Sequence, residues 1–182
     1  MKFRVIFLAF LGLMSISCNQ GSSSAGISIQ PEITLNSPDF EQISKDNYSI
    51  KVHKDWIVEL YPEDEMAMYI YLDTSDDFVE NINLIIRDLG DVAITLDEVA
   101  QAAQREFASQ GRIISSEKII TPSKEHQRMI VTSKYYGEDL KFILHYIVKN
   151  SHVYILTFTS LERDFNTYEK VAEQIMQSFT VK

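Results

Sequence analysis

Acidic side chains gather in two short segments whose oxygens could bind a hard cation. Residues 63–65 read Glu-Asp-Glu, and a second group is spread over residues 73–80. The candidate ligands in the second group are Asp73, Asp76, Asp77 and Glu80. Carboxylates are ligands that Ca²⁺ prefers, but neither segment has the EF-hand spacing. Solvated loop charge is the simpler interpretation, and a cation- or small-ligand-binding module built on the two loops is the alternative.

The four histidines are the other side chains that could bind a metal or transfer a proton. They are His53, His126, His145 and His152. No two of them have the spacing of three or four residues that is typical of metal ligands. His145 and His152 could approach each other across a hairpin at Asn150-Ser151, which leaves a shared site open. Histidines on the solvated face of a sheet are the simpler interpretation.

The sequence contains no motif for nucleophilic catalysis or phosphate binding. It has no G-x-S-x-G elbow, and its six glycines form no phosphate-binding loop. The one cysteine, Cys18, lies outside the predicted domain. We therefore expect no enzymatic activity, no catalytic residue and no cofactor.

The N-terminus has the pattern of a bacterial export signal. A basic start is followed by the apolar run Val5–Met14 and then by small residues. The run is shorter than the roughly 20 apolar residues that span a bilayer as a helix. Ser15-Ile16-Ser17 suits the ordinary signal peptidase, so residues 1–17 are predicted to be removed. Followed by Cys18, these residues also resemble the lipobox of bacterial lipoproteins, with Ser15 where a leucine is usual.

The lipobox resemblance implies that Cys18 is joined to diacylglycerol and begins the mature chain. In an oxidising compartment a lone thiol is a liability, and lipidation consumes it. The Gly- and Ser-rich residues that follow, together with Pro31 and Pro38, predict a flexible tether over residues 18–40. Asn19 favours, by resemblance to enterobacterial sorting, an outer-membrane location facing the periplasm. Plain secretion is the alternative.

The mature chain is strongly acidic. Without residues 1–17 it has 15 Lys+Arg and 26 Asp+Glu, a formal charge of −11. This charge disfavours binding to nucleic acid and attraction to anionic lipid head groups. The expected partners are therefore the membrane, reached through the N-terminal lipid, and an envelope protein of unknown identity.

Hydrophobic periodicity predicts one domain over residues 41–182. Thr95-Leu96-Asp97-Glu98 is a capping box that begins a helix, and Gly111 is predicted to end that helix in the left-handed conformation. A second helix is predicted over residues 164–178. Strands are predicted at 48–52, 56–60, 66–72, 82–86, 113–120, 127–136, 140–149 and 152–159.

The predicted order is four strands, a helix, four strands and a helix. Turn residues at Tyr136-Gly137-Glu138 and Asn150-Ser151 predict that the last three strands form an antiparallel meander. Strands joined by tight turns exclude a doubly wound parallel sheet. The predicted fold class is α+β, with a single antiparallel sheet and the helices packed on it.

Several short patterns, in their order and spacing, resemble the PsbP/DcrB-like superfamily, which includes small bacterial lipoproteins. Within residues 47–182 they are Tyr48-x-Ile50, Trp56, Asn81-Ile82-Asn83, Thr95-Leu96-Asp97-Glu98, Tyr154–Ser160 and Ser178-Phe179. His53, where proline is frequent, and residues 121–126, which lack a frequent glycine, depart from the superfamily pattern. The resemblance implies a PsbP/DcrB-like sandwich without a shared catalytic motif. Its members are mostly accessory, scaffold or binding proteins.

The sequence thus predicts a non-enzymatic, lipid-anchored protein of the bacterial cell envelope. Its domain is expected to bind or support another envelope component. Most aromatic residues fall on core positions. The tyrosines without an assigned place are Tyr69, Tyr71, Tyr135 and Tyr136. An exposed face shared by several of them would indicate a partner-binding surface.

Overall fold

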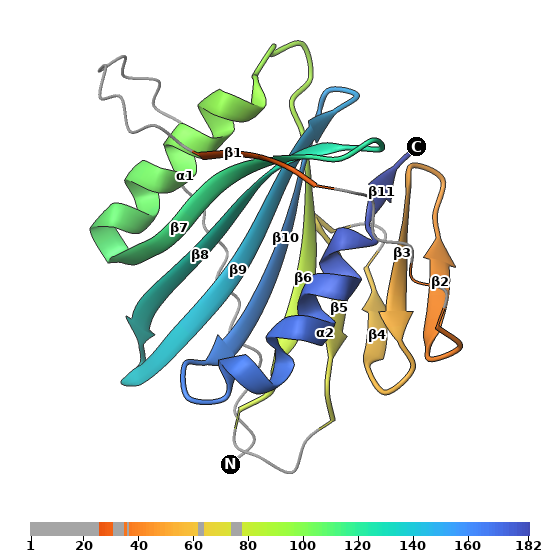
Figure 1. Cartoon of the computed structure of the whole chain (residues 1–182). Coiled ribbons are helices and arrows are strands. Elements are labelled where there is room, and N and C mark those ends of the chain that lie inside the picture. The colour runs from red at the N-terminus through yellow and green to blue at the C-terminus, as the bar shows by residue number, and fades with distance from the viewer. Residues whose placement is uncertain (1–25, 31–34, 36, 62–63, 74–77) are drawn as a thin grey trace.

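The computed structural model describes two sheets and two helices (Figure 1). The described residues are 26–30, 35, 37–61, 64–73 and 78–182. The predicted signal peptide, Cys18, Glu63 of the first acidic segment and the cation candidates Asp76 and Asp77 lie outside them.

The strands and helices follow one another in chain order as β1 to β6, α1, β7 to β10, α2 and β11. The strands before α1 are β1 Gly26–Ile29, β2 Phe40–Ser44, β3 Tyr48–His53, β4 Ile57–Leu60, β5 Met66–Tyr71 and β6 Asn81–Asp88. The later strands are β7 Gly111–Ile120, β8 Glu125–Tyr135, β9 Glu138–Lys149, β10 His152–Leu161 and β11 Thr180–Val181. The helices are α1 Leu96–Gln110 and α2 Phe165–Gln177. All eight predicted strands and both predicted helices are therefore present.

The meander after α1 is confirmed. β8, β9 and β10 are antiparallel neighbours. At the β8–β9 turn Tyr136 and Gly137 have φ angles of 47° and 89°, and at the β9–β10 turn Asn150 and Ser151 have 53° and 58°. Two consecutive residues with positive φ match the right-handed twist of a hairpin. These turns join three strands of 11, 12 and 10 residues.

The prediction of a single antiparallel sheet is wrong. The large sheet has eight strands in the order β1-β7-β8-β9-β10-β6-β5-β4, and it is mixed because β1 pairs with β7 in parallel. β3, β2 and β11 form a separate three-stranded sheet. Consequently β3 and β4, although joined by a short turn, belong to different sheets. Periodicity identifies a strand but does not choose its pairing partner, which can lie far away in the sequence.

The predicted tether also extends too far. Residues 26–29, which fall within the predicted flexible segment 18–40, form β1 and pair with Glu117–Ile120 of β7. Leu35 is buried, and β2 begins at Phe40. A four-residue strand behind a Gly- and Ser-rich stretch is too short for hydrophobic alternation to reveal it. The ordered chain therefore reaches closer to Cys18 than the composition indicates.

The first helix begins as predicted but ends differently. The Thr95 hydroxyl accepts a hydrogen bond from the Glu98 amide at 3.2 Å, and a Glu98 carboxylate oxygen accepts one from the Thr95 amide at 2.8 Å. This is the predicted capping box. Gly111, however, has φ −172° and ψ −154°, which is extended rather than left-handed. Gly111 is the first residue of β7 and pairs with Ser133 of β8. Its backbone lies so close to β8 that a side chain would meet the carbonyl oxygen of Thr132.

Replacing Gly111 with alanine should destabilise the protein by about 1–3 kcal/mol, because a methyl group there overlaps the carbonyl oxygen of Thr132. Urea unfolding followed by the fluorescence of Trp56 measures the loss. Gly26→Ala is the matched control, since a Cβ at Gly26 meets nothing within 4 Å. If the Gly111→Ala variant and the wild type had the same free energy of unfolding, β7 and β8 could move apart at this point without loss of stability.

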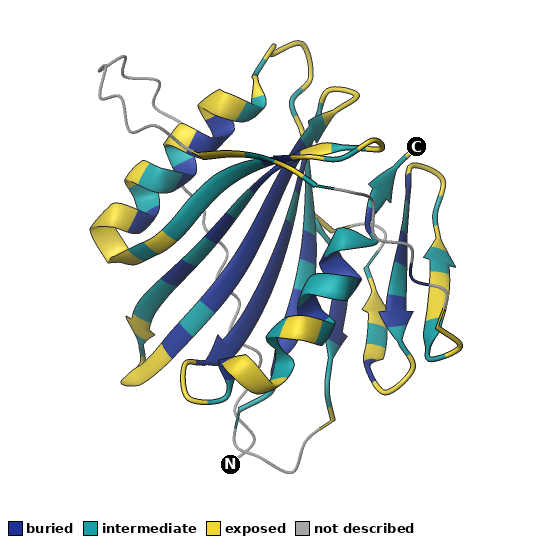
Figure 2. Cartoon of the chain, viewed as in Figure 1, coloured by how far each residue is buried: buried dark blue, intermediate teal, exposed yellow. Residues whose placement is uncertain are grey.

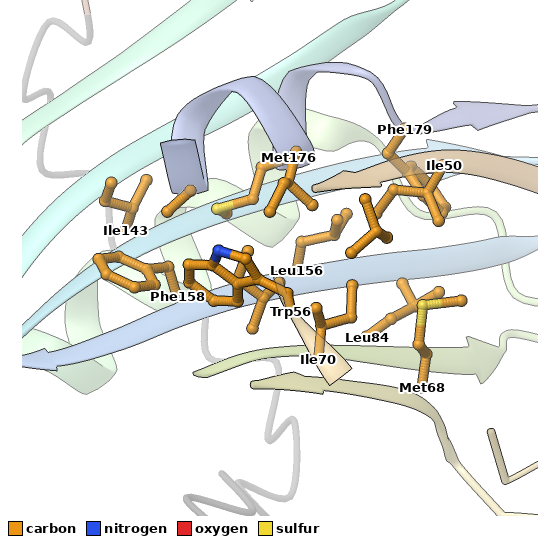
Figure 3. Close-up of a cluster of buried hydrophobic side chains, with 14 of the residues drawn as sticks. Ile50, Trp56, Met68, Ile70, Leu84, Ile143, Leu156, Phe158, Met176 and Phe179 are labelled. Carbon is orange, nitrogen blue, oxygen red and sulfur yellow. The ribbon is translucent and has the colours of Figure 1, made fainter. Parts of the chain in front are cut away.

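Each face of the large sheet is covered by its own apolar cluster. On one face α2 and β3 pack over a cluster that includes Trp56, Phe158, Met176 and Phe179 (Figure 3). On the other face α1 packs over β7, β8 and β9, with Phe107 among the buried residues of that cluster. β9 and β10 lie between the two clusters and are buried along most of their length (Figure 2). The central strands therefore form the core of the domain.

Candidate functional site

The described part of the acidic loops does not assemble a cation site. Asp73 is exposed, whereas Glu80 is only 3% exposed and its carboxylate accepts a 3.4 Å hydrogen bond from the Ser160 hydroxyl. Among the described residues, no group of three His, Cys, Asp or Glu side chains could hold a metal ion. Because Asp76 and Asp77 lie outside those residues, cation binding stays a prediction.

Two histidines lie in the core, so their predicted placement on a solvated face is wrong. His126 of β8 and His145 of β9 are 1% and 0% exposed, and their ring centroids are 4.6 Å apart. His145 does not approach His152 across the hairpin, since His145 lies opposite Leu156. The alternation of β9 carried a usable signal, because it places His145 on the same face as Ile143 and Ile147. The pair His126 and His145 could not be read from sequence spacing.

A polar network connects His145 to α2, and His126 contacts this network through the ring of His145. Glu173 of α2 accepts a hydrogen bond of 2.6 Å from Arg128 Nε, and its second carboxylate oxygen lies 3.4 Å from His145 Nε2. Arg128 also contacts Glu117 of β7 at 3.2 Å. The Arg128 and Glu173 side chains are 14% and 13% exposed. We call His126, His145, Arg128 and Glu173 the His–Arg–Glu cluster.

Burial controls the protonation of the cluster. Desolvation, reinforced by the nearby His145 and Lys124, lowers the pKa of His126 to about 2. Desolvation also lowers the pKa of His145, and it outweighs the opposing effect of Glu173. Burial alone would raise the pKa of Glu173, but the hydrogen bond with His145 and the charge of Arg128 together lower it. Both imidazoles are therefore neutral at neutral pH, and the cluster connects α2 to the sheet.

Two rows of polar side chains cross the other face of the sheet, on β5, β6 and β10. The strand register places Tyr71, Asn81 and Thr159 side by side, and Tyr69, Asn83 and Thr157 form the adjacent row. Opposed residues on paired strands project from one face of the sheet. We call these six residues the Tyr–Asn–Thr face.

The Tyr–Asn–Thr face lies beside α1 rather than beneath it. The packing of α1 is on β7, β8 and β9, at the opposite end of the sheet from β5 and β4 (Figure 1). Four of the six side chains are buried, namely Tyr69, Asn81, Thr157 and Thr159. Asn83 and Tyr71 are half-buried, and Ile57 of edge strand β4, which lies opposite Tyr71, is 40% exposed. The accessible part of this face is therefore its β4–β5 edge.

Aromatic and acidic groups meet at that edge. The carboxylate of Glu59 accepts hydrogen bonds from the hydroxyls of Tyr71, at 3.2 Å, and Tyr61. The Tyr69 and Tyr71 rings are 5.3 Å apart. Burial, and then the charge of Glu59, raises the pKa of Tyr69. Asn81 Oδ1 is buried and has no hydrogen-bond partner among the described residues. The face thus combines rings, hydroxyls, amides and a carboxylate, which are groups that can form hydrogen bonds and ring contacts with a ligand.

The four unassigned tyrosines do not share one surface. Tyr69 and Tyr71 belong to the Tyr–Asn–Thr face, whereas Tyr135 and Tyr136 form a separate pair at the β8–β9 turn, with centroids 4.5 Å apart. Tyr136 is 83% exposed. The threonines of the face were missed, although Thr157 and Thr159 alternate with core residues along β10 and so indicated a polar stripe.

None of the helices in the described residues is long and apolar enough to cross a membrane.

Comparison with known proteins identifies the fold. No protein-family model and no curated protein sequence matches the chain. Among solved structures, cyanobacterial PsbP (CyanoP) from Synechocystis sp. PCC 6803 aligns with a TM-score of 0.63 and 13% identity, covering 81% of this chain and 95% of that one. LpqN of Mycobacterium tuberculosis, described as involved in cell envelope biogenesis, aligns with a TM-score of 0.57 and 15% identity over 79% of this chain and 90% of its own.

A third solved structure agrees. PA94 from Pseudomonas aeruginosa, a protein of unknown function, aligns with a TM-score of 0.53 and 15% identity over 76% of this chain and 94% of its own. The chain therefore has a PsbP-like fold, an α+β architecture with one large mixed sheet, a three-stranded sheet and two helices.

Proposed function

We propose that this protein is a non-enzymatic, lipid-anchored component of the bacterial cell envelope whose domain binds another envelope component. The observation that carries the binding role is the accessible β4–β5 edge of the Tyr–Asn–Thr face, where half-buried Tyr71 lies beside the exposed side chains of Glu59 and Ile57. The sequence has no motif for nucleophilic catalysis, and the imidazoles of His126 and His145 are buried.

The anchor is proposed at Cys18. The apolar signal, the small residues before the cysteine and the Gly- and Ser-rich residues behind it support this proposal. Two acyl chains anchor a protein stably, whereas one holds it only marginally. Asn19 supports an outer-membrane location facing the periplasm. A role in the envelope is supported by LpqN, a protein of similar fold that is described as involved in cell envelope biogenesis.

Replacing Cys18 with serine should move the protein from the membrane fraction to the soluble fraction, or leave the signal peptide uncleaved. The reason is that a hydroxyl cannot form the thioether to diacylglycerol. Fractionation of cells and intact mass measurement of the wild type and the variant check this. Ser17→Ala, which keeps a small residue before the cysteine, is the control. A Cys18→Ser variant that stays in membranes at its normal mature mass would refute the anchor.

The binding face is tested by photo-crosslinking in intact cells. A benzoylphenylalanine in place of Tyr71 should form a covalent adduct with the partner, because position 71 lies at the accessible edge of the Tyr–Asn–Thr face. The same group in place of Lys170, exposed on α2 over the opposite side of the sheet, should not form that adduct. Adducts at both positions, or at neither, would contradict the assigned face.

A further inference from the structure

An apolar patch lies at the β1 edge of the large sheet. Ile27 and Ile29 of β1 are 70% and 84% exposed, and Ile120 of β7, directly opposite Ile29, is 37% exposed. All three project from the same face, because Ile27 precedes Ile29 by two residues on the strand. β1 is at one end of the strand order and is largely exposed (Figure 2). We call Ile27, Ile29 and Ile120 the isoleucine patch.

The isoleucine patch is close in sequence to the proposed lipid. Gly26, the first residue of β1, is eight residue steps from Cys18. A fully extended chain of that length spans at most about 29 Å, at roughly 3.6 Å per residue. The anchor therefore keeps β1 near the membrane surface. A short link to the anchor gives β1 a high effective concentration at the membrane, so even a weak affinity of β1 for the membrane is sufficient for contact.

We propose that the isoleucine patch inserts into the interfacial region of the membrane that holds the lipid of Cys18, so that the domain lies against the bilayer by its β1–β7 edge. This inference rests on the proposed anchor at Cys18. Exposed aliphatic side chains on a rigid strand are suited to the boundary between head groups and acyl chains, where insertion reaches roughly 5–10 Å. Three such side chains would bind a membrane weakly in free solution, but the covalent anchor removes most of the cost of association.

The contact is apolar rather than electrostatic. The cation nearest the patch in the register is Lys118, opposite Ile27. Its ammonium group contacts Asp97 and lies 3.1 Å from Glu125, so its charge is already paired within the domain. The mature chain is also acidic, which disfavours attraction to anionic head groups. Insertion should therefore be insensitive to salt.

A tryptophan placed in the patch tests this proposal. Cys18 is the only thiol, so the chain from Cys18 to Lys182 can be coupled there to a maleimide lipid in phosphatidylethanolamine–phosphatidylglycerol vesicles with brominated acyl chains. The emission of an Ile29→Trp variant should fall about twofold and shift to shorter wavelength on coupling, as expected for insertion to interfacial depth. Trp56 is buried, and its emission is measured in the unsubstituted chain and subtracted.

The control is Tyr136→Trp, another highly exposed position, at the β8–β9 turn. The proposal is supported if bromine quenches the tryptophan at position 29 but not the one at position 136. The quenching at position 29 should also persist at high salt and decrease when Ile27→Ser is added. No quenching at position 29, or equal quenching at both positions, overturns it. A dimer of the uncoupled chain that Ile29→Ser converts to a monomer would instead assign the patch to a second copy. Chemical coupling supplies the anchor, so failure here is distinct from failure of the Cys18→Ser fractionation.

Discussion

Acidification from about pH 7.5 to about pH 5 should lower the free energy of unfolding by at least about 2 kcal/mol, through His126 alone. The pKa of His126 is about 2 in the folded protein and about 6.5 when exposed. Below pH 6.5 the unfolded chain therefore binds a proton that the folded chain excludes. Each histidine of this kind costs about 1.4 kcal/mol per pH unit until the folded pKa is reached.

His145 acts in the same direction, because burial lowers its pKa too. The pKa of Glu173 is also lowered, and it adds a further loss of stability once the pH falls below the usual carboxylate range, near 4.5. All three effects therefore destabilise the folded chain in acid. Stability should be greatest above the usual histidine pKa and should fall continuously below it.

Urea unfolding at a series of pH values, followed by Trp56 fluorescence, measures this dependence. His126→Leu should remove the His126 part of the pH slope. It breaks no protein hydrogen bond, because neither ring nitrogen of His126 has a partner among the described residues. His53→Gln, at the last residue of β3, is the control variant. The burial of His126 would be contradicted if the free energy of unfolding of the wild type did not change between about pH 7.5 and about pH 5. It would also be contradicted if the His126→Leu variant showed the same dependence of stability on pH as the wild type.

Replacing Arg128 with methionine should destabilise the protein by about 3–5 kcal/mol, the usual cost of leaving a buried charge without its partner. Arg128 is the cation that contacts both Glu173 and Glu117 beneath α2. Methionine resembles the apolar part of the arginine side chain, so the loss of stability measures mainly the removal of the charge. Chemical denaturation at neutral pH provides the measurement.

A double-mutant cycle separates charge from packing. Arg128→Met combined with Glu173→Met removes both charges and should recover a large part of the loss, because a matched apolar pair needs no desolvated ions. The exposed pair Arg163 and Asp164 provides the comparison, and Arg163→Met should cost about 0–1 kcal/mol. If the losses from Arg128→Met and Glu173→Met simply add, the two residues are not coupled.

Local patterns predicted the elements of this fold well. The capping box at Thr95 and Glu98 located the start of α1, and the alternation of Leu140–Lys149 located β9. Both signals depend on residues within a few positions of one another. Turn residues such as Tyr136-Gly137 act over the same short range, so the hairpins of the meander were also predictable.

Long-range pairing was not predictable in this way. β1 is parallel to β7, some ninety residues later, and β3 leaves its chain neighbour β4 to pair with β2 and β11. Gly111 illustrates the same limit. Its residue type suggested a left-handed helix end, whereas its position beside Thr132 of a later strand requires the absence of a side chain.

The candidate sites differ in the same respect. Composition indicated an acidic mature chain, the N-terminal pattern predicted export, and the lipobox resemblance implied lipidation at Cys18, all from residues read in linear order. Export and lipidation stay predictions. The His–Arg–Glu cluster and the Tyr–Asn–Thr face depend on register between strands and on the helix above them. No local pattern records that His126 lies against His145, or that Tyr71, Asn81 and Thr159 form one row. Hydrogen bonding between strands set those neighbours, since a shift of one residue would have turned each side chain to the opposite face.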